Sequence, residues 1–308
     1  VSVEEFGYWQ YFLLWASYVG VMHLGFGDGV YLKLGGQYWE SIDRKEWIPQ
    51  IQSMFFVQLI ISLMVVLFSF LLCNNEKYLI IFLWTAAYLV IENTYKIITM
   101  AMMATDQIPF VSKTVIIDKL IMSALVLYLI FIHNENASYI MCSYTLAHLV
   151  VCIMTIHRCR LFASIQMPDK KLFASIATVC KIGFILMLAN FVSILIMGLC
   201  RLAVEHYWNI EVFSKLSFSI TIASFLLFFI SQIGYVLFPI LKRIRKDAQA
   251  ILFEKMDFVM TLLPMVFYIF FFVMYFFVIN WLPKYEDSLK FLAFTAPCIC
   301  YETRVVIL

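Results

Sequence analysis

Residues 47–75 read WIPQIQSMFFVQLIISLMVVLFSFLLCNN and contain no Asp, Glu, Lys or Arg. A helix that crosses the hydrocarbon core of a bilayer needs about 20 mostly apolar residues. The run exceeds this length, and it lacks the polar–apolar alternation that an outer-membrane β-strand requires. It therefore predicts a membrane-spanning helix.

The composition of the whole chain agrees with this prediction. Of the 308 residues, 64% are hydrophobic and 14% are charged, and the mean hydropathy is +0.91. Soluble domains are about 45–50% apolar and about 25% charged. The composition excludes a disordered chain, and the low cysteine density excludes a secreted disulfide scaffold. We expect an all-α integral membrane protein.

Further segments of the same kind follow along the chain. Five more uncharged runs cover residues 120–134, 136–157, 182–200, 216–241 and 258–283. Three weaker apolar segments cover residues 8–26, 78–103 and 289–308. Together with residues 47–75, they predict eight spans and an incomplete ninth, hence 8–9 transmembrane helices.

The basic residues of the loops set the expected orientation. Fourteen of the 22 Lys and Arg residues fall in residues 31–50, 104–113, 157–181 and 241–255, and only four fall in the alternate loops. The positive-inside rule places the first set in the cytoplasm. The first residues then lie outside. Because the chain starts at Val1 without a signal peptide, we expect a fragment that lacks one preceding span and further spans at its end.

Enzyme and metal motifs are missing from the sequence. It contains no Walker loop, no G-x-S-x-G and no H-E-x-x-H. The eight cysteines are scattered, without a C-x-x-C pair or a His/Cys cluster at metal spacing. We therefore predict no catalytic residue, no metal and no cofactor.

Charged residues within the spans are the candidate functional groups, because burying one in a bilayer costs about 2.5–3.5 kcal/mol. Each also has a structural interpretation. Glu92 and Lys96 can pair with each other at i,i+4 spacing, and Asp118 and Lys119 can reach the interface. Asp28 can bond a neighbouring loop, and Arg201 can anchor the end of its span. His23 and His148 are best interpreted as satisfied core histidines.

The order of several short strings along the chain resembles a known family. The strings are Gly7-Tyr-Trp9, residues 23–36 (HLGFGDGVYLKLGG), 183–190, 197–201, 213–219, 229–231, 236–243 and 281–288. In this order they resemble the bacterial polysaccharide and O-antigen flippases of the multidrug/oligosaccharidyl-lipid/polysaccharide exporter superfamily. The resemblance covers essentially the whole chain.

The resemblance implies a polytopic transporter of two pseudo-symmetric helical bundles. Residues 1–156 would form the first bundle without its first helix. Residues 157–181 would be a cytoplasmic amphipathic linker, and residues 182–308 the second bundle without its last helices. The implied location is the bacterial inner (cytoplasmic) membrane.

The implied activity is transfer of a lipid-linked oligosaccharide, usually on undecaprenyl diphosphate, from the inner to the outer leaflet for surface polysaccharide such as the O-antigen of lipopolysaccharide. Arg201, which matches an arginine common in the family, and the in-span cations Lys96 and Lys119 are the expected substrate-cavity residues. Glu92, Asp118 and Asp28 are expected to bind a coupling ion or to pair with those cations. Other proteins of the polysaccharide-export pathway are possible partners, and no nucleic acid is expected.

Two other functions stay open. A cation-coupled multidrug antiporter of the same superfamily would use acidic residues in the first bundle, and Glu92 and Asp118 are available for this role. A membrane polysaccharide polymerase or acyltransferase is less favoured, because the expected outer loops are short and none carries a His/Asp constellation.

Overall fold

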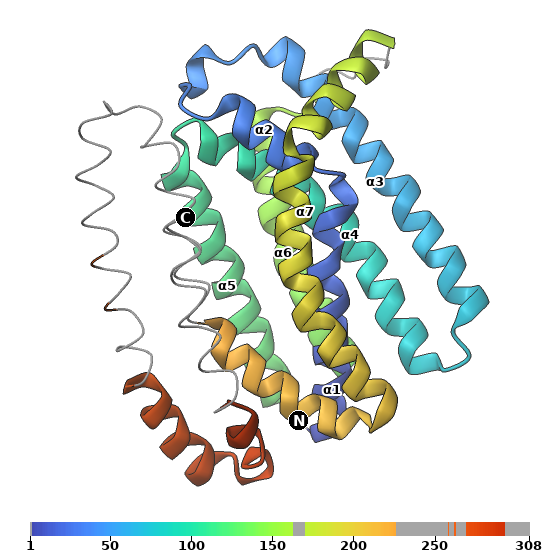
Figure 1. Ribbon diagram of the computed structural model, residues 1–308, viewed down its shortest axis with the longest axis vertical. Helices are drawn as coiled ribbons and strands as arrows, with labels where there is room; N and C mark the ends of the chain where they lie inside the picture. The colour runs from blue at the N-terminus through green and yellow to red at the C-terminus, as the bar shows by residue number, and fades with distance from the viewer. Residues whose placement is uncertain (1, 163–169, 226–257, 259–261, 263–268, 293–308) are drawn as a thin grey trace. The chain divides into compact units, whose positions relative to one another are not determined.

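The computed structural model describes residues 2–162, 170–225, 258, 262 and 269–292 (Figure 1). In these ranges every regular element is a helix and none is a strand, which confirms the predicted all-α class. The longer helices are α1 (Val3–Tyr18), α2 (Phe26–Leu34), α3 (Arg44–Leu72), α4 (Glu76–Ala104), α5 (Ile108–Phe131), α6 (Ala137–Cys159) and α7 (Lys170–Tyr207). Short 3₁₀ turns are η1 (Val19–His23), η2 (Trp39–Ser41) and η3 (Pro283–Tyr285).

Capping side chains fix where four helices begin. Each accepts a hydrogen bond from a backbone N–H of the first turn, which satisfies a donor that the helix itself cannot use. The caps of α1, α3, α4 and α6 are Ser2, Asp43, Asn75 and Asn136. Helix α5 has a proline in its first turn, where the missing N–H costs nothing. These local signals separate apolar stretches that hydropathy alone would run together.

Among the described residues, five helices are long and apolar enough to cross a membrane: α3, α4, α5, α6 and α7. Helix α1 has 16 residues, and η1 extends the same segment to His23. Large apolar side chains lie open on the outside of these helices, with Leu71 77% and Phe131 82% exposed. A water-soluble protein would cover such surface, so the exposed side chains are consistent with contact to lipid.

Two predicted span boundaries differ from the structure. Helix α5 begins at Ile108, not near residue 120, and α7 begins at Lys170, not at residue 182. A search for uncharged runs stops at any charged residue, whereas Asp118 and Lys181 lie inside continuous helices. As a result, Asp118 and Lys119 lie near the middle of α5 rather than at its end.

The chain divides into two compact units, Val1–Cys200 and Arg201–Leu308. In the first unit, α4 is the central helix, with α1, α2, α3 and α6 packed around it (Figure 1). The described part of the second unit comprises the end of α7, helix 210–225, helix Ile269–Trp281, η3 and residues 288–292. Most of residues 216–308 lie outside the described residues, including the loop 241–255, most of the predicted span 289–308 and parts of the predicted spans 216–241 and 258–283.

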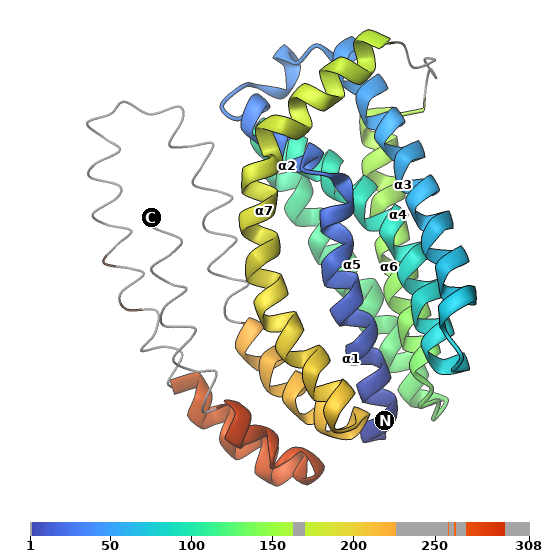
Figure 2. The same cartoon turned by 45° about the vertical axis from the view of Figure 1, so that its right-hand side comes forward.

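The two compact units do not test the predicted boundary between the two bundles. The predicted linker 157–181 contains the end of α6, a segment outside the described residues, and the first turns of α7. The part of α7 that belongs to the first unit packs alongside α1 and α2 (Figure 2). The division into two pseudo-symmetric bundles stays a prediction.

The glycine-rich stretch at residues 25–29 is the point where the first helical segment breaks. Leu24 and Gly25 both adopt left-handed backbone conformations, with φ of 55° and 77°, between η1 and α2. Gly25 is suited to this position because it has no Cβ to oppose a positive φ. The break turns the chain from the α1 direction into the nine-residue helix α2.

Helix α7 packs closely against this break. A Cβ added at Gly183 would collide with the carbonyl of Gly25 and the backbone of Gly29, and one at Gly29 would collide with the carbonyl of Val179. Small residues let the backbones of membrane helices approach. Glycine is therefore required on both sides of the α2–α7 contact.

Candidate functional site

Helix α4 carries buried and half-buried polar groups at mid-length, and two of them belong to separate clusters. Tyr88, Glu92 and Lys96 follow one another at a spacing of four residues, which places them along one side of the helix. Glu92 contacts a histidine of α6, whereas Lys96 reaches the break between η1 and α2. The i,i+4 pairing of Glu92 with Lys96 is absent from the ion pairs of the described residues.

The first group, here called the acid–histidine cluster, consists of Glu92, Asp118 and His148. The Nδ1 atom of His148 lies 2.9 Å from Oδ1 of Asp118, and its Nε2 atom lies 3.6 Å from Oε2 of Glu92. The imidazole thus stands between two carboxylates. The three residues come from α4, α5 and α6, so that the cluster ties three spans together close to their midpoints.

Tyrosine rings surround the imidazole. The ring of Tyr144 lies 4.6 Å from that of His148, the ring of Tyr88 lies 5.2 Å away and the ring of Tyr95 lies 6.4 Å away. The Tyr95 and Thr114 hydroxyls are 2.9 Å apart, which adds a contact between α4 and α5. Two of the three rings, Tyr88 and Tyr95, come from α4, and Tyr144 comes from α6 itself.

Lys119 lies at the edge of this cluster. Its Nζ atom is 2.8 Å from Oδ2 of Asp118 and 5.7 Å from the centre of the Tyr144 ring. The lysine side chain is 59% exposed, whereas the side chain of Asp118 is 6% exposed. Lys119 therefore neutralises the buried carboxylate from outside, and the expected substrate contact of this lysine stays a prediction.

The second group, here called the break cluster, consists of His23, Asp28 and Lys96. Nε2 of His23 lies 3.7 Å from Oδ2 of Asp28, and both side chains are buried. Nζ of Lys96 lies 3.0 Å from the position that a Cβ on Gly20 would take, and its charge acts on both His23 and Asp28. Two of the residues predicted from sequence, Asp28 and Lys96, thus meet here.

Side-chain amides satisfy the backbone around the break. Gln58 of α3 donates to the carbonyl of Met22 at 2.9 Å, and Asn93 of α4 donates to the carbonyl of Val19 at 2.9 Å. The N–H of Gly25 donates to Nδ1 of His23. Interrupted membrane helices need such replacement partners, and in transporters they border ion and substrate sites.

Arg201 lies at the start of the second unit. Its Nε donates to Oγ of Ser217 at 3.1 Å, and its guanidinium lies 5.4 Å from the centre of the Phe213 ring. Both partners belong to helix 210–225, so Arg201 joins the end of α7 to the next helix. Arg201 belongs to the second unit, whereas Lys96 and Lys119 belong to the first, so a substrate cavity shared by the three cations stays a prediction.

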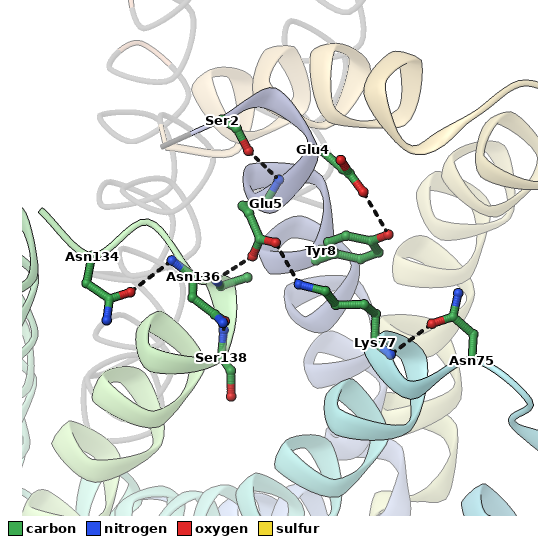
Figure 3. Close-up of polar contacts among 10 residues, drawn as sticks. Ser2, Glu4, Glu5, Tyr8, Asn75, Lys77, Asn134, Asn136 and Ser138 are labelled. Atoms are coloured by element: carbon green, nitrogen blue, oxygen red, sulfur yellow. Dashed lines mark hydrogen bonds and ion pairs between the residues drawn. The ribbon is translucent and has the colours of Figure 1, made fainter.

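Glu5 forms a third polar group, at the end of the first unit that is expected to lie outside (Figure 3). Its two carboxylate oxygens accept from Nζ of Lys77 at 2.7 Å and from the backbone N–H of Ala137 at 2.7 Å. Burial raises the pKa of the Glu5 carboxyl, but the N–H of Ala137 and the ammonium of Lys77 outweigh burial, so the pKa lies below its ordinary value. One carboxylate thereby holds the starts of α1, α4 and α6.

Two cavities open beside these groups. A polar cavity of about 220 Å³ adjoins Glu5, Tyr8, Lys77, Asn136 and Ser138. An almost wholly apolar cavity of about 270 Å³ lies between the α1–η1 segment, α3 and α4, and is lined by side chains that include Trp15, Met22, Phe68, Leu72 and Phe82. Neither cavity is lined by the acid–histidine cluster.

Sequence reasoning missed His148 and His23 as site residues. A signal for His148 was present in the spacing: Tyr144, His148 and Cys152 repeat every four residues on α6, like the polar side of α4. Two such polar stripes on neighbouring spans predict a buried contact. Among the described residues, no three His, Cys, Asp or Glu side chains are placed to hold a metal ion.

Comparisons with protein-family models, with curated proteins and with solved structures give no match to this chain. In the part of the chain that the structure describes, the fold and the site define an all-helical protein with five helices able to cross a membrane and with ionisable groups buried between them.

Proposed function

We propose that this chain is a transporter that moves a lipid-linked oligosaccharide from the inner to the outer leaflet of the bacterial cytoplasmic membrane. The order of sequence motifs that resembles the O-antigen and polysaccharide flippases supports the substrate class. The charge difference between alternate loops supports the orientation. The proposed carrier is undecaprenyl diphosphate.

Buried charge in the middle of the spans is the observation that carries the proposal. Glu92, Asp118 and His148 meet near the midpoints of three spans, and His23, Asp28 and Lys96 meet at a helix break. A protein with only a structural role in the bilayer avoids the cost of such groups, whereas transporters use them for substrates and coupling ions.

The physical task is to carry a polar sugar and a diphosphate through hydrocarbon. A cation about 4 Å from a phosphate contributes about 4 kcal/mol at an effective dielectric of about 20, far more than in water. Arg201, Lys96 and Lys119 are the cations proposed for this role. Alternating access between two helical bundles would expose the headgroup first to one side and then to the other, without covalent chemistry.

A cation-coupled multidrug antiporter is the second candidate, and the acid–histidine cluster favours it. Two carboxylates beside an imidazole in the first unit can hold a proton for exchange against a cationic drug. A drug-susceptibility panel in a strain that lacks its own exporters separates the two functions. The antiporter raises resistance to several cationic drugs, and the flippase leaves resistance unchanged.

Complementation tests the flippase function. Expression of the protein in a flippase-deficient strain should restore surface polysaccharide, and Arg201→Ala should abolish this rescue while the protein still inserts in the membrane. Lys181→Ala is the matched control, because Lys181 is an exposed cation on the same helix α7. Full rescue by Arg201→Ala combined with Lys96→Ala would overturn the residue assignment, and no rescue by the wild type would contradict the function.

A further inference from the structure

His148 and Glu92 face each other without a hydrogen bond between them. Nδ1 of His148 lies 2.9 Å from Oδ1 of Asp118, without a hydrogen bond of good geometry, and this is the shorter of the two contacts of the imidazole. Because a carboxylate only accepts, we assign the single proton of a neutral imidazole to Nδ1. A neutral imidazole then has an unprotonated Nε2. That lone pair faces Oε2 of Glu92 at 3.6 Å, and this oxygen is buried and accepts no hydrogen bond within the described part of the chain.

Two acceptors that face each other in a low-dielectric interior repel, and an unmade buried hydrogen bond costs about 1–3 kcal/mol. One added proton, on Nε2 or on Oε2, converts this repulsion into a hydrogen bond. We infer that His148 and Glu92 form a proton-binding site, in which one proton is shared between Nε2 and Oε2 and joins α6 to α4.

The balance of charges around the imidazole also supports a bound proton. The groups that face the imidazole are Glu92, Tyr88 and Tyr95 from α4, Asp118 and Lys119 from α5, and Tyr144 and Cys152 from α6 itself. From α1, Trp9 and Phe12 pack against Tyr144, and neither of them titrates. Two carboxylates and one ammonium leave one net negative charge, and a single proton cancels it.

Proton occupancy changes how the three spans are joined. An imidazolium has two N–H donors and can bond both acids, whereas a neutral imidazole has one donor and can bond only one. Loss of the proton therefore keeps the α6–α5 contact through Asp118 and releases the α6–α4 contact through Glu92. The coupling of this proton to transport rests on the proposed flippase function. The proton site itself does not depend on that function.

Proton uptake by the purified protein tests the site without any substrate. The chain has five histidines, and His133, His157 and His206 are exposed. Replacing these three with Asn gives a background in which only His23 and His148 remain, so that exposed imidazoles do not obscure the measurement. Uptake is measured with a pH-indicator dye as a weakly buffered detergent solution is brought from about pH 8 to about pH 5, the range in which histidine titrates.

On this background, Glu92→Gln and His148→Asn should each lower uptake by about one proton per chain. The amide introduced by Glu92→Gln keeps the size of the side chain and can donate to Nε2, so this variant satisfies the contact without a proton and preserves folding. Glu76→Gln is the matched control on α4, because Glu76 is exposed and remote from the cluster. Uptake by Glu92→Gln equal to that of the background would overturn the site.

Complementation of the flippase-deficient strain then separates the site from the function. Full surface polysaccharide with Glu92→Gln, despite lost proton uptake, would overturn the link between this proton and transport. Normal proton uptake by a wild-type protein that fails to complement would contradict the flippase function and leave the site standing.

Discussion

Glu5 connects three helices at one end of the first unit. It lies in the first turn of α1, and its carboxylate contacts Lys77 of α4 and the first N–H of α6 (Figure 3). These contacts are charge-assisted and therefore stronger than hydrogen bonds between neutral groups. The neighbouring Glu4 is exposed and accepts a hydrogen bond from the hydroxyl of Tyr8 on its own helix.

Glu5→Gln should lower the free energy of unfolding by about 1 kcal/mol at neutral pH, because the amide keeps the shape of the side chain and loses its charge. The pKa of Glu5 lies below its ordinary value of 4.5 in the folded protein. Its charge therefore stabilises the fold fully above that ordinary value, and the stabilisation is lost as the pH falls through the folded pKa. Thermal unfolding in detergent at several pH values measures this.

Glu4→Gln is the control and should change stability by only a few tenths of a kcal/mol at any pH. A difference between wild type and Glu5→Gln that stays constant from neutral pH down to well below 4.5 would contradict the proposed role of the charge.

Residue types in a span indicate which groups are costly to bury, but not their partners. Glu92, Asp118, Asp28 and Lys96 could all be singled out from the sequence because each is ionisable in an apolar context. Their histidine partners are harder to recognise, since a histidine in a span is compatible with ordinary packing, and only the four-residue spacing of Tyr144, His148 and Cys152 signals one of them. Which carboxylate meets which imidazole depends on the rotation of each helix about its axis, and sequence spacing does not determine that rotation between helices.

At the scale of elements, the contact between α2 and α7 depends on glycines, which have no side chain. Gly183 of α7 faces the backbone of Gly25 and Gly29, with no space for a Cβ. Backbone atoms cannot move aside as the end of a flexible side chain can. Any side chain at this position must therefore displace one helix from the other.

Gly183→Ala should lower the free energy of unfolding by about 1–3 kcal/mol, which is typical of overpacking, despite the better helix propensity of alanine. Gly27→Ala is the control, since its Cβ would meet the His23 ring at 3.5 Å, an ordinary van der Waals distance. Denaturation in detergent compares the two variants. Equal stability of both would show that α2 and α7 do not approach as closely as the structure has them.

The sequence predicted which helices exist more reliably than it predicted where they begin and end. The apolar runs led to α3, α4 and α6 within a few residues of their ends, because polar capping residues flank them. For α5 and α7 the runs were too short, because a buried Asp118 and a surface Lys181 interrupt them without ending the helix. A charge ends an apolar run in the sequence, but only a backbone conformation ends a helix.

At the scale of the whole molecule, composition is sufficient to predict an all-α membrane protein. The five helices able to cross a membrane within the described ranges agree with that class. The predicted total of eight or nine spans and the two-bundle architecture depend on residues beyond the described ranges, and the substrate depends on the resemblance of short motifs. The substrate must be tested by functional measurement, because a fold class alone does not determine a substrate.

Lipid translocation in vesicles tests the flippase proposal most directly. The purified protein is reconstituted with a fluorescent lipid-linked oligosaccharide, and the label that reaches the opposite leaflet is quenched from outside. The wild type should speed translocation above that in protein-free vesicles. Arg201→Ala should slow it by about tenfold or more, as expected for a lost charge-assisted hydrogen bond to the diphosphate, whereas Lys181→Ala should have no effect. Translocation by the wild type at the protein-free rate would contradict the proposal.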